Sequence, residues 1–501
     1  MPELVLAHDL GTTGNKASLF DLEGHPLVSA FEGYATDYPR PGWAEQDPAD
    51  WWRAISRSTR RVLAESGRRG EDVAVASFSG EMMSCLLVDA KGLPLRKAII
   101  WADQRAEAEA SWMAERLGAA EGYRITGHRL GASYTAAKVL WVRAHQPDLY
   151  TRTAKVLQAK DYAAWMLTGA WATDYSDASG TNLFDLRERR WSGEILSALG
   201  LEPELLPPVV PSATVIGNVT RAAAEATGLA PGTPVVIGGG DGACATVGVG
   251  AVHPGDAYGY IGSSAWVSMV SREPLADPQQ RVGNFAHQDP KYIFPTGSMQ
   301  AAGGAYDWLE RVLRGDGSQR LYQELDALAA ATEPGAKGLV FLPYLIGERS
   351  PYWNPHARAS FVGLSMAHGR AEMARAVLEG VAFNLRLILD VFRELGAWFS
   401  ALRLIGGGAR SATWRQILAD VFNLPILRPK LLVEATSLGA AIAGGVGVGL
   451  YPGYEVASQL VQVQPGEKPR PTAAARYDEI FPIFRETYTA LAPIFERTVA
   501  P

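Results

Sequence analysis

A single aspartate follows the apolar run at residues 235–237 and stands among glycines. Asp241 comes after three consecutive glycines and before a fourth. A carboxylate at the end of a strand, with no bulky neighbours, lies at the mouth of a cleft and can take a proton from a reacting group. The alternative is an Asx-type turn, in which the side chain stabilises its own backbone. We expect Asp241 to act as a general base.

A glycine- and threonine-rich segment near the N-terminus has the composition of a phosphate-binding loop. Such a loop needs backbone N–H groups that point inward, small side chains, and hydroxyls or a cation to offset charge. Gly11-Thr12-Thr13-Gly14 with Lys16 meets these needs, although a polar hairpin turn explains it as well. The chain has no G-x-x-x-x-G-K-[ST] and no intact G-x-G-x-x-G, so the signatures of two commoner nucleotide-binding folds are absent.

A second glycine cluster lies between a predicted strand and a predicted helix. Gly406-Gly407-Gly408 follows the strand-like run 402–405 and precedes the helix-like run 412–421. A flat ring or a phosphate can lie directly on such a backbone. A tight strand-to-helix turn is the equally good alternative.

Two further clusters contain groups that suit a ligand with many hydroxyls. Ser79-Gly80-Glu81-Met82-Met83 precedes a strand-like run, and Trp101-Ala102-Asp103-Gln104-Arg105 follows one. Together they offer aromatic, thioether and carboxylate groups. Methionines are more often core filler, and Asp103 with Arg105 is more often a surface pair, so these clusters indicate a sugar site only together with the other motifs.

The elements that position these residues alternate between strands and helices. Helix-like periodicity covers residues 48–65, 105–117, 370–395 and 412–421, and Asp47 before Pro48 is typical of a helix start. Strand-like runs include residues 5–7 and 17–20, joined by a glycine-rich bend, and residues 73–78, 86–88, 98–101, 235–237, 258–266 and 402–405. This alternation predicts an α/β fold.

The length of 501 residues exceeds what one hydrophobic core supports, so more than one domain is expected. Pro254-Gly255 is the most favourable boundary. We therefore predict an N-terminal lobe at residues 1–253 and a C-terminal lobe at residues 254–501.

Composition excludes several classes of protein. The 47 basic and 53 acidic residues give a net charge of −6 without a basic stripe, so nucleic acid is not an expected partner. The two cysteines form no paired motif, which fits a reducing cytoplasm. Residues 435–454 carry no charge, but their glycines favour a buried helix start and turn over a membrane span. The N-terminus has no secretory signal, so neither export nor membrane attachment is expected.

Taken in order, these segments resemble the FGGY carbohydrate kinases, a family that contains xylulokinase, glycerol kinase and gluconokinase. The likeness covers nearly the whole chain. Its markers are DLGTTG (9–14), WAEQDP (43–48), WADQR (101–105), SYTAAKVLW (133–141), GGDG (239–242), GERSP (347–351), GL (363–364) with the helix at 372–384, GGGARS (406–411) and SLGAA (437–441).

The resemblance implies a two-lobed, duplicated actin-like ATPase (ribonuclease H-like) fold, with ATP and sugar meeting in the cleft between the lobes. It makes Asp241 the general base and Asp9, with Asp241, the carboxylates for Mg²⁺. The implied nucleotide residues are Gly11, Thr12, Thr13 and Lys16 in the first phosphate loop, Gly262 and Ser263 in the second, Gly303, and Gly407 and Gly408 beneath the adenosine. The implied sugar residues are Glu81, Met82, Met83, Trp101, Asp103, Trp266 and Asp241.

Departures from the family pattern bear on the substrate. Xylulokinases usually carry Gln-Met-His where this chain has Glu81-Met82-Met83, and the Arg-Glu pair of glycerol kinases is absent. The GDGA sequence at 240–243 is similar to gluconokinases, although an anionic sugar would bind poorly near Glu81. We expect ATP-dependent phosphorylation of D-xylulose or a similar ketose or polyol. Erythritol, erythrulose, ribulose, gluconate and glycerol stay open as substrates, and a homodimer stays open as the state in solution.

Two readings from other classes compete with a sugar kinase. An actin- or chaperone-like ATPase would change shape with its nucleotide and bind protein partners, but it would not need the predicted sugar residues. A non-catalytic sugar sensor is the second, and retention of both Asp9 and Asp241 argues against it.

Overall fold

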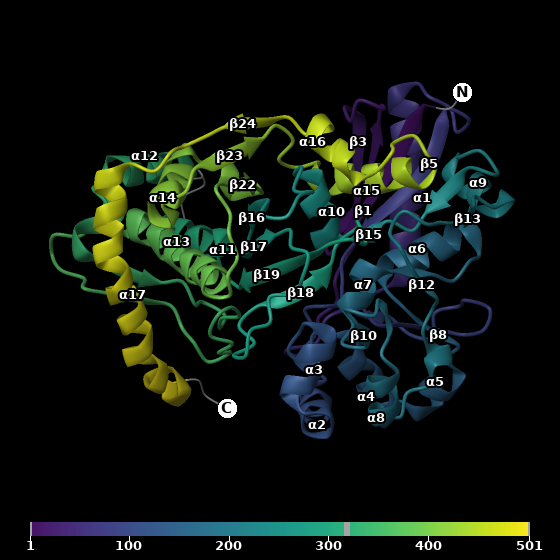
Figure 1. Ribbon diagram of the computed structural model, residues 1–501, viewed down its shortest axis with the longest axis horizontal. Helices are drawn as coiled ribbons and strands as arrows, with labels where there is room; N and C mark the ends of the chain where they lie inside the picture. Colours follow the sequence, from purple (N-terminus) through teal and green to yellow (C-terminus); the bar gives the residue numbers. More distant parts are fainter. Residues whose placement is uncertain (1–2, 315–320, 499–501) are drawn as a thin grey trace. The chain divides into compact units, whose positions relative to one another are not determined.

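The protein is described from a computed structural model, which covers residues 3–314 and 321–498. Its chain forms two compact units (Figure 1). The first contains Met1–His253, Val270–Phe294 and Glu434–Val461, and the second contains Pro254–Met269, Pro295–Val433 and Gln462–Pro501. Each unit is built on a mixed β-sheet with helices packed against it.

The units are not two continuous halves of the chain. The first division falls between His253 and Pro254, at the position expected from the sequence, but two later segments return to the first unit. Glu434–Val461 returns because its helix α15 (Ala435–Gly447) packs against strands of the first sheet. Val270–Phe294 returns because its residues form hydrogen bonds with the rest of the first unit. For example, Tyr123 Oη donates to the carbonyl of Val282 at 2.9 Å.

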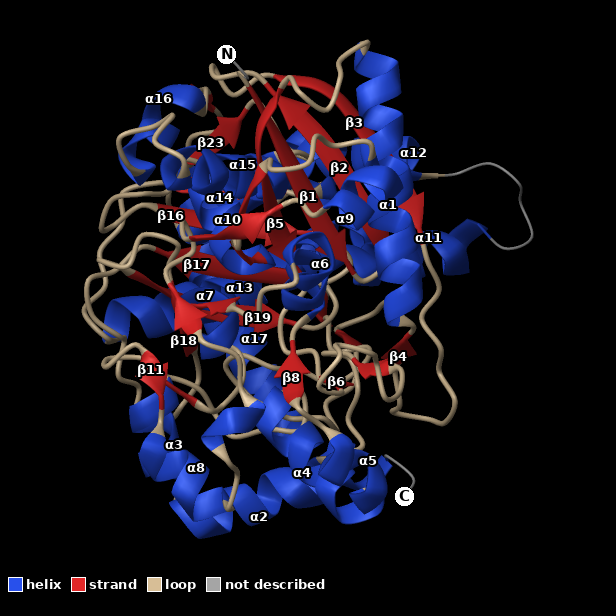
Figure 2. Ribbon diagram, turned by 90° about the vertical axis from the view of Figure 1, so that its right-hand side faces the viewer, coloured by secondary structure: helices blue, strands red, loops and turns tan. Residues whose placement is uncertain are grey.

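The sheet of the first unit has the strand order β13-β14-β5-β1-β2-β3, and β15 pairs with β5. Its strands are β1 (Leu4–Gly11), β2 (Gly14–Phe20), β3 (Pro26–Gly33), β5 (Val73–Gly80), β13 (Val215–Asn218), β14 (Pro234–Val236) and β15 (Gly239–Gly240). The antiparallel pairing of β1 with β2 confirms the predicted hairpin, and Figure 2 shows β1, β2 and β3 side by side. β1 and β5 are parallel.

Helices cover both faces of this sheet. Successive side chains of a strand point to opposite faces, and Leu6 of β1 joins a buried core with Trp51 of α1 (Pro48–Ser66), whereas Val5 lies towards Gly444 of α15. Helix α1 begins as predicted, because the Asp47 side chain accepts a hydrogen bond from the backbone N–H of Ala49.

The remaining elements of the first unit are helices and short strands, which pair β4 with β7, β6 with β8, β9 with β12 and β10 with β11. The helices are α2 (Glu107–Leu117), α3 (Ala119–Thr126), α4 (Thr135–His145), α5 (Pro147–Arg152), α6 (Ala159–Thr168), α7 (Tyr175–Ser179), α8 (Gly193–Leu199), α9 (Arg221–Thr227), α10 (Asp241–Gly248) and α16 (Ala457–Leu460). The strands are β4 (Glu45–Gln46), β6 (Leu86–Val88), β7 (Ala98–Ile99), β8 (Lys155–Leu157), β9 (Thr173–Asp174), β10 (Phe184–Asp185), β11 (Arg190–Trp191), β12 (Val209–Val210) and β18 (Gly283–Ala286).

Within the second unit, neighbouring strands pair in the order β19-β17-β16-β22-β23-β24. Its strands are β16 (Ala257–Ile261), β17 (Ala265–Met269), β19 (Ile293–Met299), β22 (Leu402–Ile405), β23 (Ile426–Pro429) and β24 (Val463–Pro465), and β20 (Val340–Leu342) pairs with β21 (Ser360–Val362). The helices are α11 (Gly303–Arg314), α12 (Tyr322–Ala331), α13 (Arg370–Glu394), α14 (Ala412–Phe422) and α17 (Pro471–Thr498). Helix α13 confirms the long helix predicted over 370–395, and it approaches β20 so closely that a Cβ at Gly380 would lie 2.2 Å from the carbonyl oxygen of Phe341.

One predicted element is wrong. The run at 258–266, expected to be one strand, forms the antiparallel pair β16 and β17. The physical reason is the small and polar segment at its centre, where the N–H of Gly262 donates to the carbonyl of Ser264 at 2.9 Å and closes a turn.

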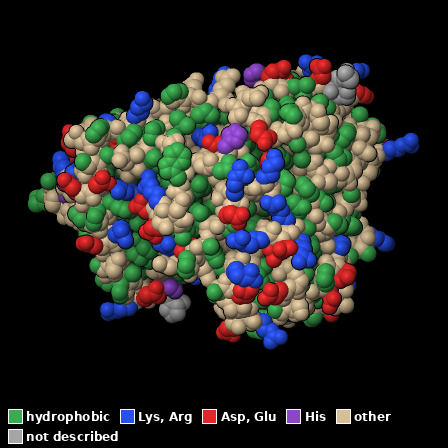
Figure 3. Space-filling view, viewed as in Figure 1, with side chains coloured by type: hydrophobic (Ala, Val, Ile, Leu, Met, Phe, Trp, Pro, Cys, Tyr) green, Lys and Arg blue, Asp and Glu red, His purple; other side chains and the backbone are tan. Residues whose placement is uncertain are grey.

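The glycine-rich segment near residue 440 packs two helices of the first unit against each other. A Cβ at Gly439 of α15 would lie 1.9 Å from the carbonyl oxygen of Cys244 in α10, and one at Gly248 would lie 1.7 Å from that of Ala435. Glycine is therefore required for the backbones to approach this closely. Over residues 3–314 and 321–498, no helix is sufficiently long and apolar to cross a membrane, and on the face in Figure 3 acidic and basic side chains are interspersed.

We predict that Gly439→Ala lowers the free energy of unfolding by about 1–3 kcal/mol, because the new methyl group forces α10 and α15 apart. Urea unfolding followed by circular dichroism measures the change. The control is Gly193→Ala, since a Cβ at Gly193 would have no atom within 4 Å. Equal stability of the two variants would contradict the close packing of α10 and α15.

Candidate functional site

Three acidic residues lie where neighbouring strands of the first unit end. β1 and β15 each pair in parallel with β5, so that Asp9 and Gly239 both stand opposite Ser79. Glu81 follows β5 directly, and Asp241 follows β15 as the first residue of α10. Because the carboxyl ends of parallel strands meet at one edge of a sheet, this register brings Asp9, Glu81 and Asp241 to the same edge.

Asp241 has the electrostatic properties expected of a general base. The residue is partly buried, and one carboxylate oxygen accepts a hydrogen bond from the N–H of Gly242 at 2.7 Å. Burial, followed by the nearby negative charge of Asp9, raises the pKa of Asp241 to about 7. A base works best when its pKa is near the operating pH, so this carboxylate is suited to accept a proton at neutral pH.

Glu81 is connected to two other predicted site residues by hydrogen bonds. The Thr12 hydroxyl donates to Glu81 Oε2 at 3.1 Å, and the indole N–H of Trp101 donates to Thr12 Oγ1 at 2.9 Å. Ser84 donates to the other carboxylate oxygen at 3.1 Å. Burial raises the pKa of Glu81 to about 7, the two hydroxyl donors oppose this, and the charge of Asp241 adds to it.

Residues that the motif analysis did not single out hold the Gly11–Gly14 turn in place. Gln46 Nε2 donates to the carbonyl of Thr12 at 2.7 Å, and Tyr34 Oη donates to the carbonyl of Gly11. Gln46 Oε1 in turn accepts from the indole N–H of Trp51 at 2.8 Å. Gln46 lies within the WAEQDP segment, so its place in a marker of the resemblance was the available signal.

A buried lysine organises the loop that carries Met83. Lys138 Nζ donates to the carbonyls of Met83, Ile100 and Ser133 at 2.8, 2.8 and 2.7 Å, which uses all three ammonium protons. Met83 has a positive φ of 67°, a conformation that needs such support. Met82 is packed more deeply, since a Cβ at Gly240 would lie 2.7 Å from its sulfur. The sugar-binding roles of Met82 and Met83 stay predictions.

Asp103 is already paired within the first unit. Its fully buried carboxylate accepts from Arg105 Nη2 at 2.7 Å and from the N–H of Ala44 at 2.6 Å. The guanidinium of Arg105 lies 3.7 Å from the centre of the Trp43 ring. This arrangement orders the segment after Trp101, and a direct bond from Asp103 to a sugar stays a prediction.

Asp9 and Lys16 lie opposite each other in the β1–β2 hairpin. Lys16 Nζ is 3.6 Å from Asp9 Oδ2, so a cation accompanies the carboxylate predicted to hold Mg²⁺. Among the residues that the structure describes, no group of three or more His, Cys, Asp and Glu side chains could hold a metal ion. Mg²⁺ commonly binds through one or two carboxylates together with substrate phosphates, and Asp9 with Asp241 fits that pattern.

The second unit contains a pocket of about 670 Å³ that brings together all five glycine and serine residues predicted there for nucleotide, a volume suited to a cofactor-sized ligand. It is lined by Ile261, Gly262, Ser263, Gly303, Tyr306, Asp307, Tyr322, Gln323, Asp326, Gly407, Gly408, Arg410, Ser411 and Trp414. The aromatic and acidic members of this set were not predicted, because they are separated in sequence and belong to no recognisable motif.

The pocket has two backbone walls. The N–H of Gly303, which begins α11, donates to the carbonyl of Gly262 at 2.8 Å, and a Cβ at Gly303 would lie 2.4 Å from that oxygen. The N-terminus of α11 therefore adjoins the turn between β16 and β17, where a helix favours phosphate. A Cβ at Gly407 would have no protein atom within 4 Å, so the backbone there is open to a ligand.

Trp266 lies on β17 in the second unit. Its ring stacks on Tyr260 with centroids 4.0 Å apart, and its indole N–H donates to Tyr258 Oη at 3.1 Å. These contacts fix the side chain against its own sheet. Its predicted contact with a sugar stays a prediction.

Comparison with known proteins identifies two family domains in order along the chain. Residues 4–248 match the N-terminal domain of the FGGY family of carbohydrate kinases, and residues 257–448 match its C-terminal domain. A xylulose kinase from Staphylococcus epidermidis is 33% identical over 487 residues, covering 97% of this chain and 96% of that protein. A gluconokinase from Bacillus licheniformis is 30% identical over 499 residues, covering 98% and 96%.

Solved structures agree with the sequence relatives. The ligand-bound xylulose kinase from Lactobacillus acidophilus superimposes with a TM-score of 0.93 and 28% identity, covering 99% of this chain and 100% of that chain.

We predict that Glu81→Gln changes how stability depends on pH. A raised carboxyl pKa stabilises the folded state below pH 4.5, and this contribution is lost as pH rises through about 7. The variant has no carboxyl group to titrate at this position and does not lose this contribution. Its free energy of unfolding, relative to that of the wild type, should therefore rise by about 2–3 kcal/mol from pH 4.5 to pH 8. Urea unfolding at both pH values checks this, and a pH-independent difference would mean that Glu81 titrates normally.

We predict that Gly407→Leu weakens binding of a non-hydrolysable ATP analogue about tenfold or more, because the side chain extends into the pocket. Calorimetry measures the affinity. The melting temperature without nucleotide should stay unchanged, since no packed atom is displaced. Gly193→Leu is the control, and an unchanged affinity in Gly407→Leu would place the nucleotide elsewhere.

Proposed function

This chain belongs to the FGGY family of carbohydrate kinases, and we propose that it transfers the γ-phosphate of ATP to a hydroxyl group of D-xylulose or a closely similar neutral ketose. Its two α/β domains with their mixed sheets have the actin-like ATPase fold of the family's solved structures. A kinase of this family needs an acceptor site, a nucleotide site and a base.

The observation that carries the proposal is the environment of Asp241. The carboxylate stands at the N-terminus of α10, beside the ends of β1 and β5, and its pKa is raised to about 7. In the proposed reaction it accepts the proton of the sugar hydroxyl while that oxygen bonds to the γ-phosphorus and the bond to the leaving ADP oxygen breaks. Phosphoryl transfer depends mainly on such positioning and on charge neutralisation.

The second unit supplies the proposed nucleotide site. The turn at Gly262-Ser263 lies against the N-terminus of α11 at Gly303, whose positive helix dipole favours phosphates, and the open backbone at Gly407, beside Gly408, supports the adenosine. Thr12, Thr13 and Lys16 in the first unit are proposed to contact the terminal phosphates. Catalysis then requires the acceptor and the γ-phosphate to meet where water is excluded.

Magnesium is the proposed metal, and Asp9 and Asp241 are the side chains that would hold it. The chemistry that Mg²⁺ supplies when bound is neutralisation of phosphate charge. The fit rests on two adjacent carboxylates, one of which raises the pKa of the other, since bringing like charges together favours a bound cation. The chain's own Lys16, 3.6 Å from Asp9, adds positive charge at the same place.

A neutral ketose is the proposed acceptor because the site is rich in carboxylates. Burial raises the pKa of both Glu81 and Asp241, and the charges of Asp241 and Asp9, respectively, add to these two shifts. The carboxylate of a sugar acid would therefore add a further like charge at low dielectric. Neutral hydroxyls can donate to Glu81 and Asp241 instead. The xylulose kinases among the relatives support this substrate class over gluconate. A cytoplasmic location and a homodimer stay predictions.

The direct test is ADP release with purified protein, ATP and Mg²⁺ over a panel of D-xylulose, D-ribulose, erythritol, glycerol and gluconate. We predict the highest kcat/KM for D-xylulose and little activity with gluconate. ATP hydrolysis that no sugar stimulates would instead support a chaperone-like ATPase.

We predict that Asp241→Ala lowers kcat about 10²–10⁴-fold, because the proton acceptor is lost. Binding of a non-hydrolysable ATP analogue should stay within about threefold of the wild type. The Gly193→Ala protein serves as the unaffected control. Near-normal turnover in the Asp241→Ala variant would exclude Asp241 as the base.

A further inference from the structure

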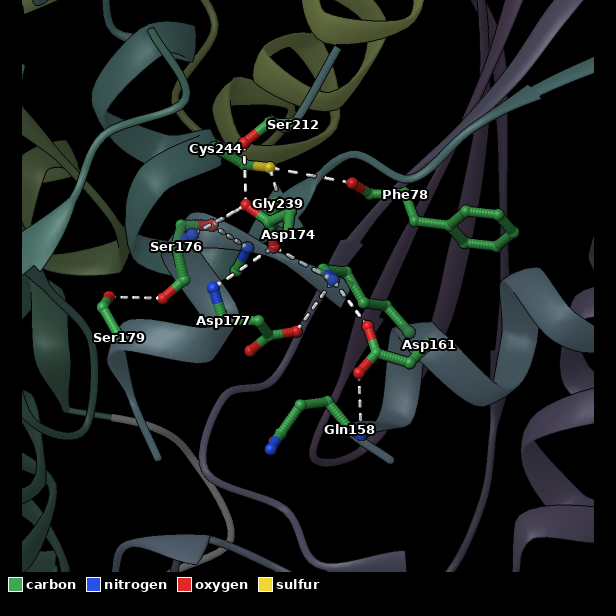
Figure 4. Close-up of polar contacts among 12 residues, drawn as sticks. Phe78, Gln158, Asp161, Asp174, Ser176, Asp177, Ser179, Ser212, Gly239 and Cys244 are labelled. Atoms are coloured by element: carbon green, nitrogen blue, oxygen red, sulfur yellow. Dashed lines mark hydrogen bonds and ion pairs between the residues drawn. The ribbon is translucent and has the colours of Figure 1, made fainter. Parts of the chain in front are cut away.

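A buried ionic cluster lies in the first unit, close in sequence to none of the predicted site residues. The ammonium of Lys160 in α6 is 2.8 Å from Asp161, 3.0 Å from Asp174 and 3.1 Å from Asp177, and all four side chains are at most 1% exposed. Figure 4 shows oxygens of the three carboxylates directed toward the same nitrogen atom. Burial alone would lower the pKa of Lys160, but the three carboxylates raise it well above its ordinary value.

Asp174 connects this cluster to helix α7. Its Oδ2 accepts from the backbone N–H of Ser176 at 2.8 Å, from the Ser176 hydroxyl at 2.5 Å and from the Ser212 hydroxyl at 2.7 Å. A serine hydroxyl has one proton to donate, and here Asp174 accepts it in a hydrogen bond. The lone pairs of Ser176 Oγ are therefore left to accept a hydrogen bond.

Ser176 accepts a hydrogen bond from the backbone N–H of the residue next to Asp241. The N–H of Gly240 donates to Ser176 Oγ at 2.8 Å, and Gly240 is the residue that caps α10. On its other side, Gly240 is in contact with Met82, since a Cβ there would lie 2.6 Å from Met82 Cγ. The backbone position from which the Asp241 side chain departs is thus fixed between the Ser176 hydroxyl and the Met82 side chain.

Lys160 also contacts the strand on the opposite side of this backbone. A Cβ at Gly80 would lie 2.7 Å from Lys160 Cβ, and Gly80 stands opposite Gly240 in the pairing of β5 with β15. The stem of Lys160 therefore supports the residue before Glu81, while its ammonium holds Asp174 and, through it, Ser176. One buried side chain supports both strand ends of the proposed acceptor site.

We propose that Ser176, held by Asp174 and Lys160, is a positioning residue that sets the Asp241 carboxylate for proton transfer; this inference rests on the proposed function. Ser176 touches neither substrate nor reacting atoms and acts through the backbone of Gly240. A misplacement of about 1 Å in a catalytic group can cost about 100-fold in rate, and buried hydrogen-bonded supports are what prevent it.

The chain offers a matched control within the same helix. Ser179 is also fully buried on α7; its hydroxyl donates to the carbonyl of Ser176 at 2.6 Å and accepts a hydrogen bond from the backbone N–H of Ala286, in another segment, at 3.1 Å. Ser176→Ala and Ser179→Ala therefore each remove one buried hydroxyl and leave one backbone N–H without its acceptor. Only the N–H that loses its acceptor in Ser176→Ala adjoins Asp241.

The experiment compares steady-state kinetics of the two variants with D-xylulose and ATP, together with their urea unfolding. We expect kcat about 10–100-fold lower in Ser176→Ala, with both KM values within about threefold of the wild type, because binding groups are unchanged. Ser176→Cys should lower kcat in the same direction, since sulfur is a weak acceptor. Ser179→Ala should keep kcat within about twofold despite a comparable loss of stability.

Three outcomes would overturn the inference. Unchanged kcat in Ser176→Ala, or an equal fall in Ser179→Ala, would reduce Ser176 to a structural role while the activity of the wild-type protein still supports the proposed function. A wild-type protein that phosphorylates no sugar in the panel would remove the proposed function and the inference with it.

Discussion

Parallel pairing of β1 and β15 with β5 is the constraint on which the candidate acceptor site depends. The pairing places Asp9 and Gly239 opposite Ser79 and Gly240 opposite Gly80. A shift of one residue in either pairing would turn the side chains to the other face of the sheet. Helices α10 and α15, which cross through glycines, hold the backbone after β15 against the face on which Asp9 lies. Register and helix packing together determine where the carboxylates stand.

The same constraint creates an electrostatic problem. Asp9, Glu81 and Asp241 share one edge of a sheet, and the pKa values of Glu81 and Asp241 are raised to about 7. Positive charge nearby is supplied by Lys16, 3.6 Å from Asp9, whereas burial lowers the pKa of Lys138 to about 7. Such a site is less stable than an apolar one and is suited to bind a cation and neutral hydroxyl groups. Buried supports, including Lys160 and Ser176, keep it in one arrangement.

Elements and residues with a local sequence signal were predictable. The β1–β2 hairpin and helix α1 followed from turn glycines and a capping aspartate. Gly407 and Gly408 followed from their place after a predicted strand, whereas Gly262, Ser263 and Gly303 followed only from the family resemblance. The run at 258–266 was misread as one strand because its apolar residues continue across the turn at Gly262. The pairing of Asp103 with Ala44, and that of Ser176 with Gly240, join residues about 60 positions apart. Single-sequence patterns carry no information on such distances, so neither pairing was predictable.

The most direct measurement is a crystal structure with D-xylulose, a non-hydrolysable ATP analogue and Mg²⁺. We predict a hydroxyl of the ketose at about 3 Å from the Asp241 carboxylate, in line with the terminal phosphate, and the Ser176 hydroxyl still bonded to the N–H of Gly240. A ketose bound away from Asp241, with that carboxylate directed toward neither sugar nor phosphate, would contradict the assignment of the acceptor site to the ends of β1, β5 and β15.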